Sequence, residues 1–277
     1  MRVIKTVADF REARRQVAGS LGFVPTMGYL HDGHLSLVRA ARAGNDCVAA
    51  SIFVNPTQFG PNEDLSRYPR DLERDLAMLR AEGTDLVFAP GVEDMYPQGF
   101  ATHVDVTGPL TARLEGAARP GHFKGVATVV TKLFNIVQPT RAYFGQKDAQ
   151  QALVIKKIVA DLDMNLEVIV MPTVREEDGL AMSSRNVYLK AKEREAALVL
   201  SRSLAIARDK WSRGEKDAER IREDMRKLIE SEPLAKIDYV SIADASTLEE
   251  LETLDKLALI SLAVRIGNTR LIDNILL

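Results

Sequence analysis

Residues 25–34 read Pro25-Thr26-Met27-Gly28-Tyr29-Leu30-His31-Asp32-Gly33-His34. An apolar run at 21–24 precedes them, and a run with helical spacing at 35–41 follows them. A strand, a glycine-bearing turn and a helix in this order form a phosphate-binding unit, because the first turn of the helix offers free N–H groups and the positive end of its dipole. The stretch therefore predicts a nucleotide site with two histidines at its mouth.

His31 and His34 allow three interpretations. They can share a metal ion, since they lie about one helical turn apart, but the sequence offers no matching Cys or Glu cluster for a third ligand. They can also be structural. Donors aimed at the α- and β-phosphates of a nucleotide fit the turn best, because Gly28 and Gly33 let the backbone approach phosphate closely. We interpret them as phosphate contacts and expect no metal site built by the protein itself.

Apolar runs and helical patterns alternate through about residue 175. Strands are expected at 21–25, 47–54, 85–89, 141–144 and 166–171, and helices at 34–43, 68–82, 124–137 and 147–161. This alternation predicts an α/β fold with a Rossmann-like parallel sheet. In such sheets, ligands bind beyond the carboxyl ends of the strands.

The pattern changes in the last part of the chain. Residues 190–231 read as two charged helices with a break at Gly214, and strands are expected at 237–242 and 257–264. We predict a Rossmann-like, nucleotide-binding domain over residues 1–178. A smaller α+β lid domain is predicted over residues 179–277, with the hinge at its start.

The composition is that of a globular protein: 46% of the 277 residues are hydrophobic, 27% are charged, and the net charge is −2. The charge balance argues against a general nucleic-acid binder.

Cys47, the one cysteine, lies inside an expected strand, so we interpret it as structural. Residues 1–9 lack the apolar core of a signal peptide, and the stretch 257–264 is too short to span a bilayer. We expect a cytoplasmic protein without membrane or nucleic-acid partners.

Polar side chains follow the expected strand at 47–54 and precede the expected helix at 124–137. Asn55 and Gln58 carry amides that can hold hydroxyl or carboxylate groups, although Asn-Pro is also a common turn. Arg119 and His122 lie in a glycine-bearing loop, which can contact an anion or be a solvated basic loop.

Two further segments can contact a nucleotide. Gly145, Gln146, Lys147 and Asp148 join an expected strand to a helix, and Gln151 lies one turn further on. Lys147 suits a phosphate, whereas Asp148 can take a ribose hydroxyl, position Mg²⁺ or cap the helix. Met182, Ser183, Ser184 and Arg185 offer two hydroxyls and a guanidinium that can close over a triphosphate, although this is also ordinary loop composition.

Taken together, these segments resemble a known family. Residues 25–34 are similar to the HIGH-type signature of the nucleotidylyltransferase superfamily, and residues 182–185 are similar to its shortened KMSKS-type loop. The chain resembles the pantoate–β-alanine ligase family over nearly its whole length. The segments that carry this likeness are FVNPTQF at 53–59, RPGHF at 119–123, FGQKD at 144–148 and LIDN at 271–274.

The resemblance implies an AMP-forming carbon–nitrogen ligase with two steps. Pantoate and ATP give pantoyl adenylate and pyrophosphate, and β-alanine then displaces AMP to give pantothenate. ATP, pantoate and β-alanine are the implied partners, Mg²⁺ is implied as the metal bound with ATP, and a homodimer through the first domain is typical of the family.

The resemblance also assigns roles to residues of this sequence. Along ATP it places Met27, Gly28, Tyr29, Leu30, His31, Asp32, Gly33 and His34, with His34 as proton donor and His31 as phosphate contact. It places Gly145, Gln146, Lys147 and Asp148 along the nucleotide, with Lys147 on phosphate, and Val174 at the adenine through its backbone. Met182, Ser183, Ser184 and Arg185 would close over the triphosphate. Gln58 and Gln151 would hold pantoate, with Gln58 also near β-alanine, and Asn55, Arg119 and His122 would support the site. The implied catalytic set is His34, His31, Lys147 and Arg185.

Two other functions stay open at this point. A different adenylyl- or cytidylyltransferase of the superfamily would transfer its nucleotide to a phosphate, but the neutral amides of Gln58 and Gln151 suit a hydroxy acid better. A nucleotide-binding module without turnover would bind ATP and release no AMP.

Overall fold

The computed structural model describes residues 1–61 and 63–277, which divide into two units by their internal contacts. The first unit comprises Met1–Thr107, Arg119–Gln146 and Gln150–Pro172. The second comprises Thr173–Leu277 together with two short segments from the first half of the chain, Gly108–Ala118 and Lys147–Ala149. The second unit thus begins slightly before the boundary expected at residue 179. Residue 175 pairs with residue 181 across the hairpin there, which keeps both in one unit.

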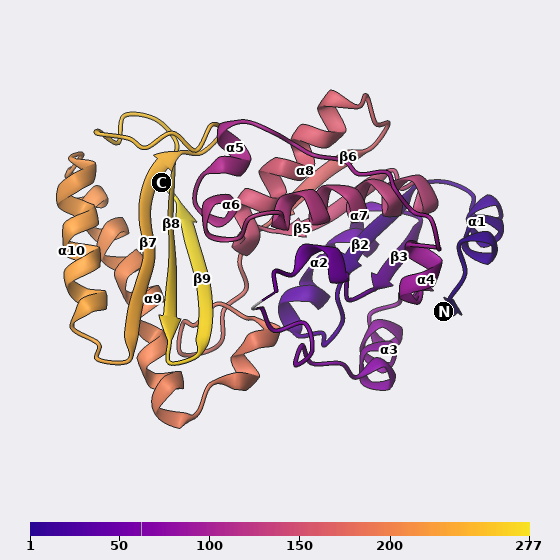
Figure 1. The fold of residues 1–277 in the computed structure, drawn as a ribbon, viewed down its shortest axis with the longest axis horizontal. Helices are drawn as coiled ribbons and strands as arrows, with labels where there is room; N and C mark the ends of the chain where they lie inside the picture. Colours follow the sequence, from indigo (N-terminus) through magenta and orange to yellow (C-terminus); the bar gives the residue numbers. More distant parts are fainter. Residues whose placement is uncertain (62) are drawn as a thin grey trace. The chain divides into compact units, whose positions relative to one another are not determined.

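A six-stranded parallel sheet forms the centre of the first unit (Figure 1). Its order is β1-β4-β3-β2-β5-β6, and every pairing between neighbours is parallel. The strands are β1 (Arg2–Ile4), β2 (Leu21–Thr26), β3 (Cys47–Ile52), β4 (Leu86–Phe88), β5 (Arg141–Gly145) and β6 (Glu167–Met171). The Rossmann-like prediction is confirmed. The sequence did not predict β1, because three residues are too few to show a period.

The helices of the first unit are α1 (Val7–Arg15), α2 (Asp32–Gly44), α3 (Leu72–Ala81), α4 (Val92–Met95), α7 (His122–Val137) and α8 (Ala149–Asp161), whose first residue belongs to the second unit. Four of these helices correspond to the expected ones, with α3 and α8 beginning a few residues later than expected, whereas α1 and α4 were not predicted. Two 3₁₀ turns, η1 (Pro56–Gln58) and η2 (Gln146–Asp148), follow β3 and β5.

The sheet is buried on both faces, which explains the continuous apolar runs of its strands. Successive side chains of β2 point to opposite faces and enter two separate cores. Phe23 packs in one core with Phe10 of α1 and Val130 of α7, and Val24 packs in the other with Val38 of α2. Both strand residues are fully buried, so β2 is fixed from both sides.

The second unit is built on an antiparallel sheet of order β7-β8-β9. Its strands are β7 (Ala235–Asp244), β8 (Ala258–Ile266) and β9 (Thr269–Leu276), and its helices are α5 (Pro109–Ala112), α6 (Glu115–Ala118), α9 (Ala191–Ser212) and α10 (Ala218–Glu230). A third 3₁₀ turn, η3 (Ser184–Tyr188), precedes α9. The predicted break at Gly214 is confirmed, since this residue lies between α9 and α10 at φ 91°.

Strand β9 was not predicted as a strand, because Asp273 and Asn274 interrupt its apolar pattern. The signal that could have revealed it is the dipeptide Gly267-Asn268 between β8 and β9, with Gly267 at φ 55°. Two such residues between strand-like runs favour a tight hairpin.

Over the described residues, the helices are too short or too polar for any of them to cross a bilayer.

Candidate active site

The first unit has a topological switch point beside β2. This strand pairs with β3 on one side and with β5 on the other, so the loops that leave β2 and β5 run to opposite faces. Ligands of open α/β sheets bind at the carboxyl ends of strands at such a point. The segments singled out in the sequence after β2, β3 and β5 all leave the sheet at this edge.

The turn after β2 has an unusual backbone. Gly28 lies at φ 84° and Tyr29 at φ 51°, a left-handed conformation that few non-glycine residues adopt. Asp75 of α3 stabilises it, because its carboxylate accepts the N–H groups of Tyr29 and Leu30, each at 2.7 Å. Its side chain is 1% exposed. Burial raises the pKa of Asp75, while the two backbone hydrogen bonds act in the opposite direction.

Sequence reasoning missed Asp75. Asp75 is one of several charged residues in α3, so its residue type alone does not distinguish it. A signal was present, because Asp75 follows Leu72 by three residues and precedes Leu79 by four, which places it on the apolar stripe. A charge at such a position must have partners, and here these are the N–H groups of the turn.

His31 and His34 lie at the start of α2 as predicted. His31 is the N-cap residue, and its carbonyl accepts the N–H of His34 at 2.8 Å. The His31 N–H lies 3.4 Å from Nδ1 of His34, and the two rings lie 4.0 Å apart between centroids. Because Nδ1 of His34 faces a donor, the neutral ring carries its proton on Nε2. His34 can therefore donate a hydrogen bond from Nε2.

Asp32 of the same turn forms an ion pair at the surface. Its carboxylate accepts from Arg39 at 2.6 Å, and Arg39 also binds Glu82. This pairing partly neutralises the negative charge of Asp32 at the helix start, where the helix dipole favours an anion.

Asn55 and Gln58 are joined in a buried hydrogen-bond network. Asn55 donates from Nδ2 to Oε1 of Gln58 at 3.0 Å and to the carbonyl of Gly125 at 3.2 Å, and it accepts from Tyr96 at 2.7 Å. Nε2 of Gln58 lies 3.3 Å from the sulfur of Met27. The structure thus places the amide of Gln58 beside the turn after β2.

Arg119 and His122 support this network from the start of α7. Nδ1 of His122 donates to the carbonyl of Gln58 at 2.9 Å, and Nε2 accepts from Arg119 at 3.0 Å. Arg119 also binds Glu63 through two hydrogen bonds of 2.8 and 2.7 Å. These contacts make both residues supports of Gln58.

Helix α7 approaches η1 closely at Gly125. A Cβ atom at Gly125 would lie 2.4 Å from the carbonyl oxygen of Thr57 and 2.6 Å from Cα of Gln58. Both contacts are with backbone, which cannot move aside as a side chain would. Glycine is required here, because a side chain at this position would push α7 away from the turn that carries Gln58.

The other expected residues of the first unit follow β5. Gly145 is the last residue of β5 and Gln146 the first of η2. The half-buried Gln151 lies in the first turn of α8.

The remaining expected residues belong to the second unit. Nζ of Lys147 lies 3.6 Å from the carboxylate of Asp148. The carbonyl of Val174 accepts the N–H of Met182 at 3.0 Å. Ser183 caps η3, and its hydroxyl accepts the N–H of Arg185 at 3.2 Å, while Ser184 is buried.

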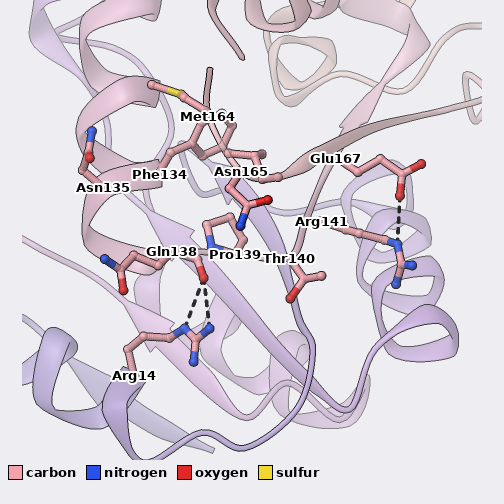
Figure 2. Close-up of a pocket in the computed structure, with 11 residues that line it drawn as sticks. Arg14, Phe134, Asn135, Gln138, Pro139, Thr140, Arg141, Met164, Asn165 and Glu167 are labelled. Carbon is pink, nitrogen blue, oxygen red and sulfur yellow. Dashed lines mark hydrogen bonds and ion pairs between the residues drawn. The ribbon is translucent and has the colours of Figure 1, made fainter. Parts of the chain in front are cut away.

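A cavity of about 780 Å³ lies elsewhere on the first unit. Its lining includes Arg141 and Glu167, the first residues of β5 and β6, which form an ion pair at 3.0 Å (Figure 2). Arg14 on the opposite wall donates to the carbonyl of Gln138. The cavity therefore lies at the amino ends of the strands, and none of the expected site residues lines it.

The sequence matches known proteins over its full length. Residues 2–276 match the family model described as pantoate-beta-alanine ligase. The chain is 65% identical to pantothenate synthetase of Roseiflexus castenholzii, covering 100% of this chain and 99% of the relative. It is 61% identical to pantothenate synthetase of Herpetosiphon aurantiacus, covering all of both chains.

Solved structures agree with these matches. Pantothenate synthetase from Thermus thermophilus superposes with a TM-score of 0.96 at 55% identity over 99% of both chains. Pantoate-beta-alanine ligase from Francisella tularensis, solved in complex with β-γ ATP and β-alanine, gives a TM-score of 0.83 at 37% identity over 100% of this chain and 97% of that chain. With the same fold and a full-length family match, this chain belongs to the pantoate–β-alanine ligase family.

Proposed function

We propose that this protein condenses pantoate with β-alanine in an ATP-dependent reaction that passes through pantoyl adenylate. The observation that carries the proposal is the pairing of two features at one sheet edge. A histidine-bearing helix start follows β2, and the buried amide of Gln58 lies 3.3 Å from Met27 of the same turn. The first suits a nucleotide phosphate, and the second suits a hydroxy acid.

In the first step, a carboxylate oxygen of pantoate attacks the α-phosphorus of ATP. A bond to that phosphorus forms while the bond to the pyrophosphate oxygen breaks, so negative charge moves onto the leaving group. We assign His34 to donate a hydrogen bond from Nε2 to the phosphate oxygens, with His31 beside it. The N–H groups and dipole at the start of α2 act in the same direction.

In the second step, the amine of β-alanine attacks the acyl carbon of the adenylate. The carbon–nitrogen bond forms, the bond to the AMP oxygen breaks with its electron pair staying on AMP, and the proton that the amine loses passes to solvent. No protein nucleophile is needed, because AMP is already a good leaving group. The protein's task is to position the reactants, and we assign Gln58 and Gln151 to hold pantoate while Asn55, Arg119 and His122 keep Gln58 in place.

Several residues of the second unit are proposed nucleotide contacts. We assign Lys147 and Arg185 to the phosphates, since each brings a positive charge, and Ser183 and Ser184 to hydrogen bonds with them. The backbone of Val174 is assigned to the adenine. Mg²⁺ would arrive with ATP as its metal complex and would neutralise phosphate charge there, and Asp148 would offer it a carboxylate oxygen.

We further propose a cytoplasmic homodimer. The family resemblance supports a dimer formed through the first unit, and the use of ATP supports the cytoplasm. Sedimentation equilibrium should then give twice the chain mass of 30.6 kDa. A single species at the chain mass at micromolar concentration would contradict the dimer.

The test of the function is a product assay with single omissions. AMP and pantothenate should form only when ATP with Mg²⁺, pantoate and β-alanine are all present. His34→Ala and Lys147→Ala should each lower kcat about 10²-fold, because each removes transition-state charge stabilisation of about 3 kcal/mol. Ser212→Ala, at an exposed position at the end of α9, is the control. Pyrophosphate release that requires a phosphorylated acceptor, with none for pantoate, would overturn the proposal.

A further inference from the structure

Strand β9 carries a polar pair that the reaction has not yet used. Asp273 and Asn274 are 2% and 4% exposed, although they lie within an otherwise apolar strand. Burying such groups costs free energy unless they are hydrogen-bonded. Their partners therefore show what the pair holds in place.

Asn274 holds the main chain at Lys147. Its Nδ2 donates to the carbonyl oxygen of Lys147 at 2.9 Å. Lys147 belongs to η2, in a short segment that is grouped with the second unit although its neighbours in sequence are not. Because the bond uses the carbonyl, it does not engage the ammonium group of Lys147, which lies 3.6 Å from the carboxylate of Asp148.

Asp273 holds the hairpin that precedes the Met182–Arg185 segment. Its carboxylate binds Arg175 through two hydrogen bonds of 2.6 and 2.9 Å, and it also accepts the N–H of Asn274 at 2.8 Å. Arg175 in turn donates to the carbonyl of Gly179 at 3.1 Å, across the tip of the hairpin. A two-bond pair between an arginine and a buried carboxylate fixes both position and orientation.

The hairpin also holds the residues that follow it, because its two strands are joined by backbone hydrogen bonds. Arg175 pairs with Ala181 in an antiparallel bridge, and the N–H of Met182 donates to Val174. Two neighbouring residues of β9 thus bind the two segments of the second unit that carry its proposed phosphate contacts.

We propose that Asn274 and Asp273 are positioning residues for the adenylation step. Asn274 fixes the backbone from which Lys147 extends, and Asp273 acts through Arg175 on the loop that carries Arg185. The inference rests on the proposed function, and both groups act through other residues. Small errors in the placement of a charged group reduce its effect on a transition state steeply.

A double-mutant cycle tests the role of Asn274. The readout is pantoate-dependent exchange of labelled pyrophosphate into ATP without β-alanine. Asn274→Ala should lower the exchange rate about tenfold in the otherwise unaltered protein. In the Lys147→Ala background the same change should have less than about a twofold effect, because the group that it positions is gone.

Ser203→Ala is the matched control for stability. Ser203 is a fully buried polar residue of the second unit whose hydroxyl donates to Leu200 at 2.8 Å. It should lower the melting temperature without lowering the exchange rate. An equal loss for Asn274→Ala with and without Lys147 would overturn the inference. Absence of exchange in the unaltered protein would instead overturn the proposed function.

Asp273 is tested through the loop that it holds. Asp273→Asn should raise the KM for ATP about tenfold with a smaller effect on kcat, because the loop is less well placed before ATP binds. Asp273→Glu retains the charge and should restore part of the affinity. ATP should protect residues 182–186 from proteolysis in the unaltered protein and less so in Asp273→Asn. Unchanged KM and unchanged protection would overturn the role of Asp273.

Discussion

Asp75 illustrates how one side chain determines the shape of the turn after β2. Both of its carboxylate oxygens accept backbone N–H groups, at Tyr29 and Leu30. Tyr29 remains at φ 51° because these two bonds offset the cost of that conformation. The turn that we assign to the nucleotide is therefore shaped from α3, a helix distant from it in the sequence.

Asp75→Asn should loosen this turn without changing a side chain that we assign to the ligand. Asparagine has one acceptor oxygen, so its NH₂ group would face one of the two N–H donors. We expect the KM for ATP to rise about tenfold, since a displaced turn aligns the phosphates poorly. Steady-state kinetics measure this.

Asp71→Asn on the same helix is the control for Asp75. Asp71 caps α3 by accepting the N–H of Arg74, a role that asparagine performs equally well. It should leave the KM for ATP unchanged. Equal kinetics for both variants would contradict the role of Asp75.

Cys47 should be unreactive at neutral pH. Burial raises the pKa of its thiol to about 11, and the nearby Asp85 carboxylate adds to the increase. The thiolate is the reactive form, and at pH 8 it would be ~10⁻³ of the total. Labelling by iodoacetamide should be slow at pH 8 and should accelerate as the pH rises toward 11. Fast labelling at pH 8 with loss of activity would contradict the raised pKa of the Cys47 thiol.

At the scale of secondary-structure elements, the contact between α7 and η1 positions Gln58, the residue that we assign to pantoate. Gly125 permits a backbone-to-backbone approach, and Asn55 donates to its carbonyl. His122, on the first turn of α7, donates to the carbonyl of Gln58. Helix α7 thus contacts η1 and the preceding Asn55 at three points. The position of the Gln58 amide therefore depends on the position of α7.

Gly125→Ala should separate these two elements. The added Cβ would meet the backbone of Thr57 and Gln58 at 2.4 to 2.6 Å, so α7 or η1 must shift. We expect the KM for pantoate to rise about tenfold or more, while the KM for ATP changes little. Gly60→Ala is the control, because its Cβ would make ordinary contacts of 3.7 Å or longer with Glu63. A larger effect on ATP than on pantoate would contradict this assignment.

At the scale of the whole molecule, the parallel sheet could be predicted from the sequence. Apolar runs of strand length recur between helical patterns, and this local signal is enough to predict β2 through β6. The sequence motifs also identified the turn at His31 and His34, because a helix start after a glycine-bearing strand end is itself a local pattern.

What the sequence could not predict depends on contacts between distant residues. Segment Gly108–Ala118 belongs to the second unit, where Glu115 binds Arg270 at 2.7 and 2.8 Å and accepts from Tyr239 at 3.0 Å. No periodicity within α6 shows that partner. The same holds for Asn274 and the carbonyl of Lys147. Sequence patterns predict helices and strands, whereas partners of buried polar residues can be identified only when the three-dimensional arrangement of these elements is known.

The central claim is that the protein forms an acyl adenylate from pantoate before β-alanine reacts. The most direct measurement is the exchange of labelled pyrophosphate into ATP with Mg²⁺ and pantoate present and β-alanine withheld. We predict exchange that depends on pantoate, is lowered about 10²-fold in His34→Ala, and ends in pantothenate when β-alanine is added. If pantothenate forms at a normal rate while no pantoate-dependent exchange and no enzyme-bound adenylate can be detected, the central claim is contradicted.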